Sequence, residues 1–176
     1  MKLFFTLSEV IFRGNASNSI LRKLLCTTTN PVAMKPNEGR LQTAEHILAH
    51  FLENGESLAK VVIAKFEEDC GLLEVFSVDD LREIDLAILQ GDVNSVIRKH
   101  LAVKKYFSKR SEAEDEFDLK RVPVSVTELR IVEIGGFDKT PCKDPHVENT
   151  SQIGVFTLLG VKRVGRDRYR FVFRVD

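Results

Sequence analysis

Three things are scarce in this sequence: cysteine, long apolar runs and net charge. Three cysteines, odd in number and irregularly spaced, argue against a disulfide scaffold and favour a reducing compartment. No apolar run reaches the roughly 18–20 residues that a membrane-spanning helix needs, so we expect no membrane partner. Because 26 basic residues balance 26 acidic ones, the chain is no bulk polycation, and any nucleic-acid contact must come from a local basic surface.

The length of 176 residues suits one domain with a hydrophobic core. Residues 1–33 differ from the rest of the chain, because they hold a single acid, Glu9, among scattered bases and many hydroxyl residues. We expect residues 1–33 to be an N-terminal extension, either poorly ordered or a targeting segment. The expected location is therefore cytoplasmic, with a mitochondrion or another organelle as the alternative if this extension is a transit segment.

Apolar residues recur at helical spacing over residues 41–52, which predicts an amphipathic helix that carries two histidines. A second long helix is expected after Ser77 or Asp79, either of which can cap it, with a possible break at Gly91. Residues 108–119 are highly charged and predict at most a surface helix. Strands are expected at residues 58–66, 72–76, 102–107, 128–134, 155–164 and 168–175. The fold class is therefore α+β, a mainly antiparallel sheet packed by the two helices in a single domain.

Cys142 and His146 lie four residues apart on a turn rich in proline, lysine and aspartate. A thiolate and an imidazole are ligands that zinc accepts, although a surface cysteine near an ordinary histidine gives the same spacing. Gln42, His46 and His50 succeed one another at four-residue intervals, so consecutive members can reach one point beside the helix. These two distant segments could close one metal site between them.

Arginine alternates with aromatic and apolar residues in the last predicted strand, residues 168–175. One face of this strand therefore packs while the other carries a row of guanidinium groups. A solvated edge strand often carries such charges to discourage aggregation, and a surface that contacts phosphates needs them as well. The candidate nucleic-acid contacts are Lys162, Arg163, Arg166, Arg168, Arg170 and Arg174.

Residues 42–48 (QTAEHIL) and 137–154 (FDKTPCKDPHVENTSQIG) together resemble an editing-domain family. This family comprises the second additional domain of alanyl- and threonyl-tRNA synthetases and the free-standing AlaX proteins, with H-x-x-x-H on a helix and C-x-x-x-H on a late loop. The resemblance implies that residues 34–176 are an AlaX-like domain that deacylates mischarged tRNA. The implied substrate is an alanine- or threonine-type tRNA carrying serine or glycine, bound by its acceptor end, and no protein partner is evident.

By the same resemblance, His46, Cys142 and His146 are the zinc ligands and the catalytic residues. Gln42 stands where the family has its first histidine, and an amide oxygen is a poor zinc ligand beside an imidazole. This difference leaves three outcomes open. The site keeps three protein ligands plus water, His50 becomes the fourth ligand, or the metal is lost and a metal-free tRNA-binding or interaction module remains.

Further candidates flank these ligands. Glu45 is a candidate base, but residues adjacent on a helix diverge by about 100°, which favours an exposed carboxylate. Asp138 and Thr140 could orient a ligand imidazole or bind the ammonium group of the amino acid. The candidate substrate-binding residues are Gln42, Thr43, Asp138 and Thr140.

A different class of hydrolase nearly fits the same helix. Gln42 to His46 would complete the metallohydrolase motif H-x-x-E-H if residue 42 were histidine. That interpretation leaves Cys142 and His146 without a role, which favours the editing family.

Overall fold

The computed structural model describes residues 37–55, 58–120 and 122–176. The predicted extension, residues 1–33, lies outside the described residues, so its character and the boundary at residue 34 stay predictions. Within the described ranges, no helix combines the length and apolar character that crossing a bilayer requires.

Seven strands form two antiparallel sheets. The larger sheet has the order β1 (Lys60–Phe66), β2 (Gly71–Phe76), β7 (Arg168–Val175) and β6 (Phe156–Gly165). The smaller sheet has the order β3 (Val103–Lys109), β4 (Glu128–Ile134) and β5 (Asp138–Pro141). The α+β class and all six predicted strands are confirmed, whereas the division into two sheets and the short strand β5 were not predicted.

Two long helices pack with these sheets. α2 (Glu38–Asn54) is the predicted histidine-bearing helix. α3 (Leu86–Ile97) begins later than predicted, because the side chain of Asp85 accepts hydrogen bonds from the N–H groups of Ala87 and Ile88 and caps it there. Gly91 lies inside α3 without interrupting it.

Short helical turns complete the chain. The predicted surface helix at residues 108–119 is wrong in extent, since α4 (Arg110–Ala113) is a single turn. Two 3₁₀ turns are η1 (Leu81–Glu83), before α3, and η2 (Thr150–Ile153), before β6. η2 is stabilised by a capping box between Asn149 and Gln152, which fixes the chain where it leaves the predicted Cys/His turn.

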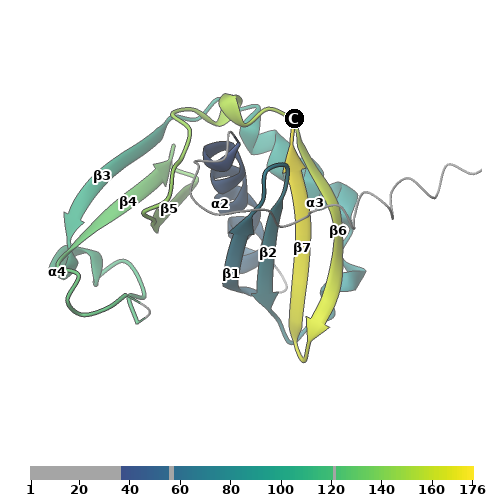
Figure 1. Cartoon of the computed structure of the whole chain (residues 1–176), viewed down its shortest axis with the longest axis horizontal. Helices are drawn as coiled ribbons and strands as arrows, with labels where there is room; N and C mark the ends of the chain where they lie inside the picture. Colours follow the sequence, from purple (N-terminus) through teal and green to yellow (C-terminus); the bar gives the residue numbers. More distant parts are fainter. Residues whose placement is uncertain (1–36, 56–57, 121) are drawn as a thin grey trace, which may run out of the picture.

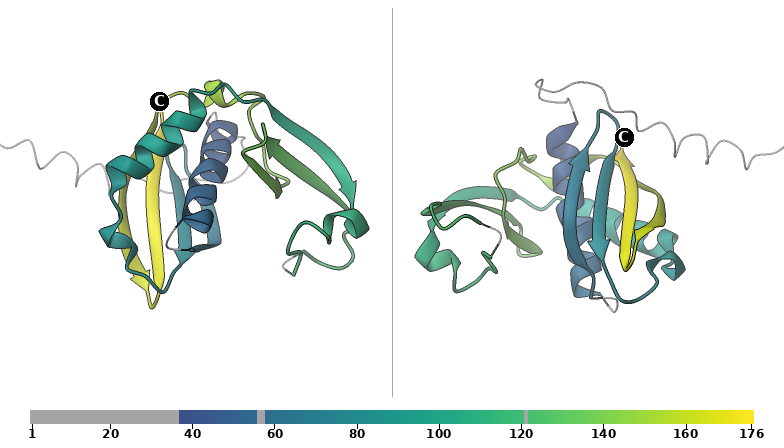
Figure 2. Two further views of the ribbon diagram at one scale, coloured as in Figure 1. Left: turned by 180° about the vertical axis from the view of Figure 1, so that it is seen from behind. Right: turned by 60° about the horizontal axis from the view of Figure 1, so that its bottom comes forward.

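The main core lies between α2 and the four-stranded sheet. α2 contributes fully buried leucine and isoleucine side chains, and β7 contributes Phe171 and Phe173, both with no exposed surface. Burial of each such side chain stabilises the fold by about 1.5–3 kcal/mol. α3 covers the same face of the sheet beside α2 (Figure 2).

α2 has the smaller sheet on its other side, so it lies between the two sheets (Figure 1). The part of the smaller sheet nearest to α2 is β5, together with the loop after it. Gln42, Glu45 and His46 are buried on α2 even though they are polar. The sandwiched position of α2 therefore creates a buried polar region between the helix and β5.

Candidate metal centre

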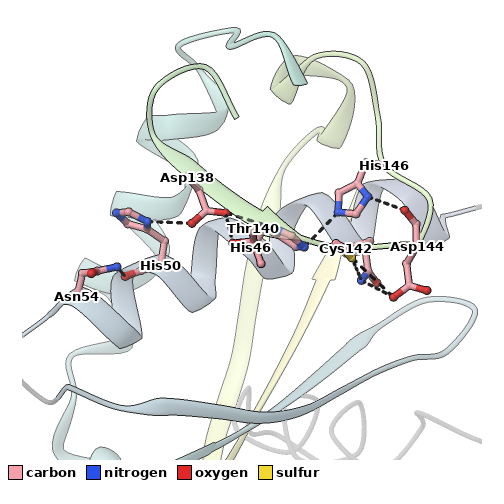
Figure 3. Close-up of polar contacts among 9 residues, drawn as sticks. His46, His50, Asn54, Asp138, Thr140, Cys142, Asp144 and His146 are labelled. Atoms are coloured by element: carbon pink, nitrogen blue, oxygen red, sulfur yellow. Dashed lines mark hydrogen bonds and ion pairs between the residues drawn. The ribbon is translucent and has the colours of Figure 1, made fainter. Parts of the chain in front are cut away.

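The polar region is built from two segments about a hundred residues apart in sequence. Thr43 ties them together, because its hydroxyl donates to the carbonyl of Gly39 at 2.7 Å and accepts from the N–H of Val147 at 3.2 Å. The loop after β5 is thereby fastened to the first turns of α2. The side chains that converge there are Gln42, His46 and His50 from α2 and Asp138, Thr140, Cys142, Asp144 and His146 from β5 and its loop (Figure 3).

The rings of His46 and His146 face each other through their Nε2 atoms, which are 3.2 Å apart. Nδ1 of His146 donates to the carbonyl of Asp144 at 2.7 Å, and Nδ1 of His46 lies 3.4 Å from a carboxylate oxygen of Asp138. A histidine that binds a metal through one nitrogen almost always has its other nitrogen held in this way. Both rings are therefore oriented as metal ligands are.

Cys142 completes a cluster of three possible ligands. The nitrogen atoms of His46 and His146 and the Cys142 sulfur all lie within 4.8 Å of one another. Two nitrogen ligands on a tetrahedral zinc, each at about 2.0–2.1 Å, would be about 3.3 Å apart, close to the separation of the two imidazole nitrogens. Cys142 is a half-buried free thiol. These three residues could hold a metal ion, as their spacing in the sequence predicts.

The pKa values of the two imidazoles are shifted in opposite directions. Burial alone would lower the pKa of His46, but its hydrogen bonds to Asp138 and Cys142 outweigh burial and raise that pKa to about 10. Burial and the charge on His46 lower the pKa of His146 to about 3. His46 therefore donates its Nε2 proton to the neutral His146. A metal ion would have to displace that proton, so metal binding should weaken as the pH falls.

The Asp138 carboxylate contacts Nδ1 of both helix histidines, His46 and His50. This carboxylate accepts hydrogen bonds from Thr140 at 3.1 Å and from Nδ1 of His50 at 3.1 Å, in addition to its contact with His46. Burial would raise the pKa of Asp138, but these hydrogen bonds outweigh it and lower the pKa, so the group is ionised. Asp138 thus lies against both helix histidines and Thr140 against Asp138, while the orienting and substrate-binding roles suggested for them stay predictions.

His50 lies outside the three-residue cluster. It contacts the second oxygen of Asp138, and its ring packs on Phe137 with centroids 4.2 Å apart. Figure 3 shows His50 on the opposite side of Asp138 from Cys142 and His146. In this arrangement His50 is a neighbour of the orienting carboxylate.

Gln42 occupies the position one helical turn before His46. It is 4% exposed, and its Nε2 donates to Asp144 at 3.2 Å and lies 3.6 Å from the Cys142 sulfur. Its Oε1 is buried and has no hydrogen-bond partner in the described part of the chain. Asp144 was missed as a site residue, although an acid placed between a cysteine and a histidine of a possible metal motif was a usable signal.

Glu45 corrects the expectation of an exposed carboxylate. Its side chain is 6% exposed, because α2 is covered on two sides and a helix residue can no longer reach solvent by turning away from one sheet. Burial raises the pKa of Glu45 to about 7, although the neighbouring charge of His46 opposes the rise. Glu45 is not a member of the three-residue cluster.

The predicted basic residues lie around β6 and β7, away from this centre. Phe171 points toward α2, so the arginines that alternate with it point to the opposite face of the sheet. Acids partly neutralise the row: Arg170 lies 2.8 Å from Glu74, and Arg174 lies 3.2 Å from Asp176. The remaining distances to acids are 4.0 Å for Arg168, 3.5 Å for Arg163 and 3.7 Å for Arg166.

Parts of this chain are similar to known proteins. Residues 129–172 match the family model of the threonyl and alanyl tRNA synthetase second additional domain. The chain is 35% identical over 91 residues to the alanyl-tRNA editing protein AlaX-M of Saccharolobus solfataricus, covering 49% of this chain and 39% of that protein. It is 33% identical over 100 residues to the alanine–tRNA ligase of Methanopyrus kandleri, covering 54% of this chain and 10% of the ligase. The chain therefore spans less than half the length of these relatives.

Proposed function

We propose that this chain, which matches the family model of the threonyl and alanyl tRNA synthetase second additional domain and is similar to AlaX-M, is a trans-editing hydrolase. The proposed reaction is hydrolysis of the ester that joins a wrong amino acid to the terminal ribose of tRNA. The observation that carries the proposal is the cluster of His46, Cys142 and His146, whose ligand atoms lie within 4.8 Å of one another. Loss of that cluster would leave the chain without a chemical centre.

The donor set of this cluster suits zinc, because two imidazoles and one thiolate match the nitrogen and sulfur ligands that zinc prefers. A zinc ion held there would act as a Lewis acid toward the ester carbonyl or toward water. The protein's own contribution is orientation. Asp138 and the carbonyl of Asp144 fix both Nδ1 atoms, so that both Nε2 atoms point into the same space.

Editing of this kind meets a physical limit of amino-acid selection. One methylene or hydroxyl group changes binding in a synthetic site by only a few kcal/mol, so a second site must remove the errors. The substrates that this logic indicates are alanine-type tRNA carrying serine or glycine and threonine-type tRNA carrying serine.

Deacylation of these three charged tRNAs by the purified chain tests the proposal. We expect turnover with zinc and a loss of about 100-fold or more in His46→Ala and Cys142→Ala, as for removal of a catalytic group. His100→Asn is the matched control, because His100 is exposed at φ 53° and asparagine tolerates that conformation. Turnover that survives both site variants would refute the proposed centre.

A metal-free tRNA-binding module of the same fold is the second candidate. The specific observation in its favour is Gln42, whose amide contacts Cys142 where a further helix histidine would complete a four-ligand set. This candidate predicts tRNA binding that a chelator does not alter, without turnover. Zinc retained at one equivalent per chain, together with deacylation, would exclude it.

A further inference from the structure

We propose that Asp144 is a fourth protein ligand of the metal centre and that Gln42 is the positioning residue that holds its carboxylate. The inference rests on the metal site of the proposed function and adds a residue that the three-ligand cluster lacks. Gln42 then has a different role from the histidine that it replaces, because its amide holds a ligand that comes from the loop after β5.

The geometry begins at Cys142. A carboxylate oxygen of Asp144 lies 3.8 Å from the Cys142 sulfur. A sulfur and an oxygen bound to one tetrahedral zinc, at about 2.3 and 2.0–2.2 Å, would lie about 3.5–3.6 Å apart. By its distance from the sulfur the carboxylate suits an oxygen ligand beside Cys142, and it lies next to the three groups whose ligand atoms are within 4.8 Å of one another without being one of them. Asp144 also lies midway between Cys142 and His146 in sequence, on the loop that supplies both of these ligands.

Gln42 explains why the carboxylate is held there. Its Nε2 donates to the same Asp144 oxygen at 3.2 Å, and a side chain that is 4% exposed has few other positions to adopt. Amide groups are good donors to carboxylates, whereas a neutral amide oxygen is a weak zinc ligand. The pair therefore assigns the charged ligand to Asp144 and the supporting hydrogen bond to Gln42.

One buried acceptor of the centre is left without a partner by its surroundings. The buried Oε1 of Gln42 has no partner in the described residues, and it belongs to the amide that touches Cys142. Beside it the Cys142 thiol contacts the Asp144 carboxylate, which also accepts from the Nε2 of Gln42. Buried polar and charged groups of this kind are normally paired or bound to a metal. A divalent cation bound here would replace the His46 proton and give these donors a common partner.

Metal binding, read without tRNA, tests the inference. Zinc affinity is measured by chelator competition for the unaltered chain, Asp144→Asn, Gln42→Ala and the exposed control Asp69→Asn. We expect Asp144→Asn to weaken binding by about 100-fold or more and Gln42→Ala by about tenfold, the effect of losing an outer partner. The visible absorption of the cobalt-loaded protein should keep its thiolate band and change its ligand-field bands in Asp144→Asn.

Two further variants protect the test from misfolding. Asp144→Glu keeps a carboxylate and should bind zinc within about tenfold of the unaltered chain, as a displaced but intact ligand. The double variant Gln42→His/Asp144→Asn gains an imidazole on α2 and should bind more tightly than Asp144→Asn alone. Circular dichroism of each metal-free variant shows whether the fold is intact.

The inference is overturned if Asp144→Asn binds zinc as tightly as Asp69→Asn does, or if the unaltered chain binds no zinc. It stands if zinc binding has the predicted order, even when no charged tRNA is hydrolysed, in which case the proposed function alone fails. Turnover together with an unchanged zinc affinity in Asp144→Asn would overturn the inference and leave the proposed function standing.

Discussion

The two sides of α2 are buried to a similar depth but differ in chemistry. Toward the four-stranded sheet, Leu41 and Leu48 are fully buried among apolar side chains. Away from those leucines, Gln42, Glu45 and His46 are only 4–6% exposed, yet they are polar. Burial on the first side stabilises the fold, whereas burial on the second side destabilises it unless each polar group finds a partner. The difference separates the apolar half of the helix, which stabilises the fold, from the half that contributes to the polar cluster.

The polar side is incompletely satisfied, and this supports a functional role. Thr43 and His46 have hydrogen-bond partners, but Gln42 retains an unpaired Oε1 and Glu45 is a buried acid with a raised pKa. A helix selected for stability alone would carry apolar residues at these positions. Departures of this kind are expected where a site needs particular groups.

The largest effect on stability is expected on the apolar side of α2. Leu48→Ala should reduce the free energy of unfolding by about 2–5 kcal/mol, because it removes buried contacts and leaves a cavity. Urea denaturation of the metal-free protein measures this change. Ile88→Ala is the matched control on α3, since Ile88 is 64% exposed and its truncation should cost less than about 0.5 kcal/mol. Equal effects of the two variants would contradict the assignment of Leu48 to the core.

The next largest effect is expected on the polar side of α2, where the buried carboxyl of Glu45 should make stability depend on pH. The pKa of Glu45 is about 7 in the fold and 4.5 in its unperturbed state, so the folded chain binds this proton more tightly. The resulting destabilisation is absent below pH 4.5, grows as the unfolded chain ionises, and is complete above pH 7 at about 3 kcal/mol.

Glu45→Gln should remove this destabilisation. The variant is therefore expected to unfold at a higher temperature than the unaltered chain at pH 8 and at nearly the same temperature at pH 4.5. Thermal unfolding in the presence of a chelator measures both. A stabilisation that does not depend on pH would mean that glutamine improves packing and that the carboxylate is not the cause.

Local sequence patterns predicted most of the fold. The helical period of α2 and the strands β4 and β7 could be read from residues that lie close together in sequence. β5 was missed because it is four residues long and ends in Pro141, so its strand geometry depends on pairing with β4. The start of α3 was misplaced because several aspartates compete as caps, and the structure selects Asp85.

The candidate site was predictable only in part. Spacing and resemblance brought His46, Cys142 and His146 to attention, and the structure brings them together. Asp144 and the burial of Glu45 depend on the placement of the β5 loop against α2, which is a tertiary contact between segments about a hundred residues apart. No helical or strand period encodes such a contact.

The smallest expected effect extends the comparison to the outer face of the large sheet. Lys162 is exposed and Arg166 is 95% exposed, whereas Arg170 is held by Glu74. If this face contacts tRNA, Lys162→Ala/Arg166→Ala should weaken tRNA binding at low salt. The slope of log K against log salt concentration should become less steep by about 0.7–0.9 for each phosphate that is no longer neutralised. Arg170→Ala should change the slope less, because Glu74 already neutralises that charge. An unchanged slope in the double variant would mean that tRNA approaches only from the metal side, and that the arginine row serves to protect the sheet from aggregation.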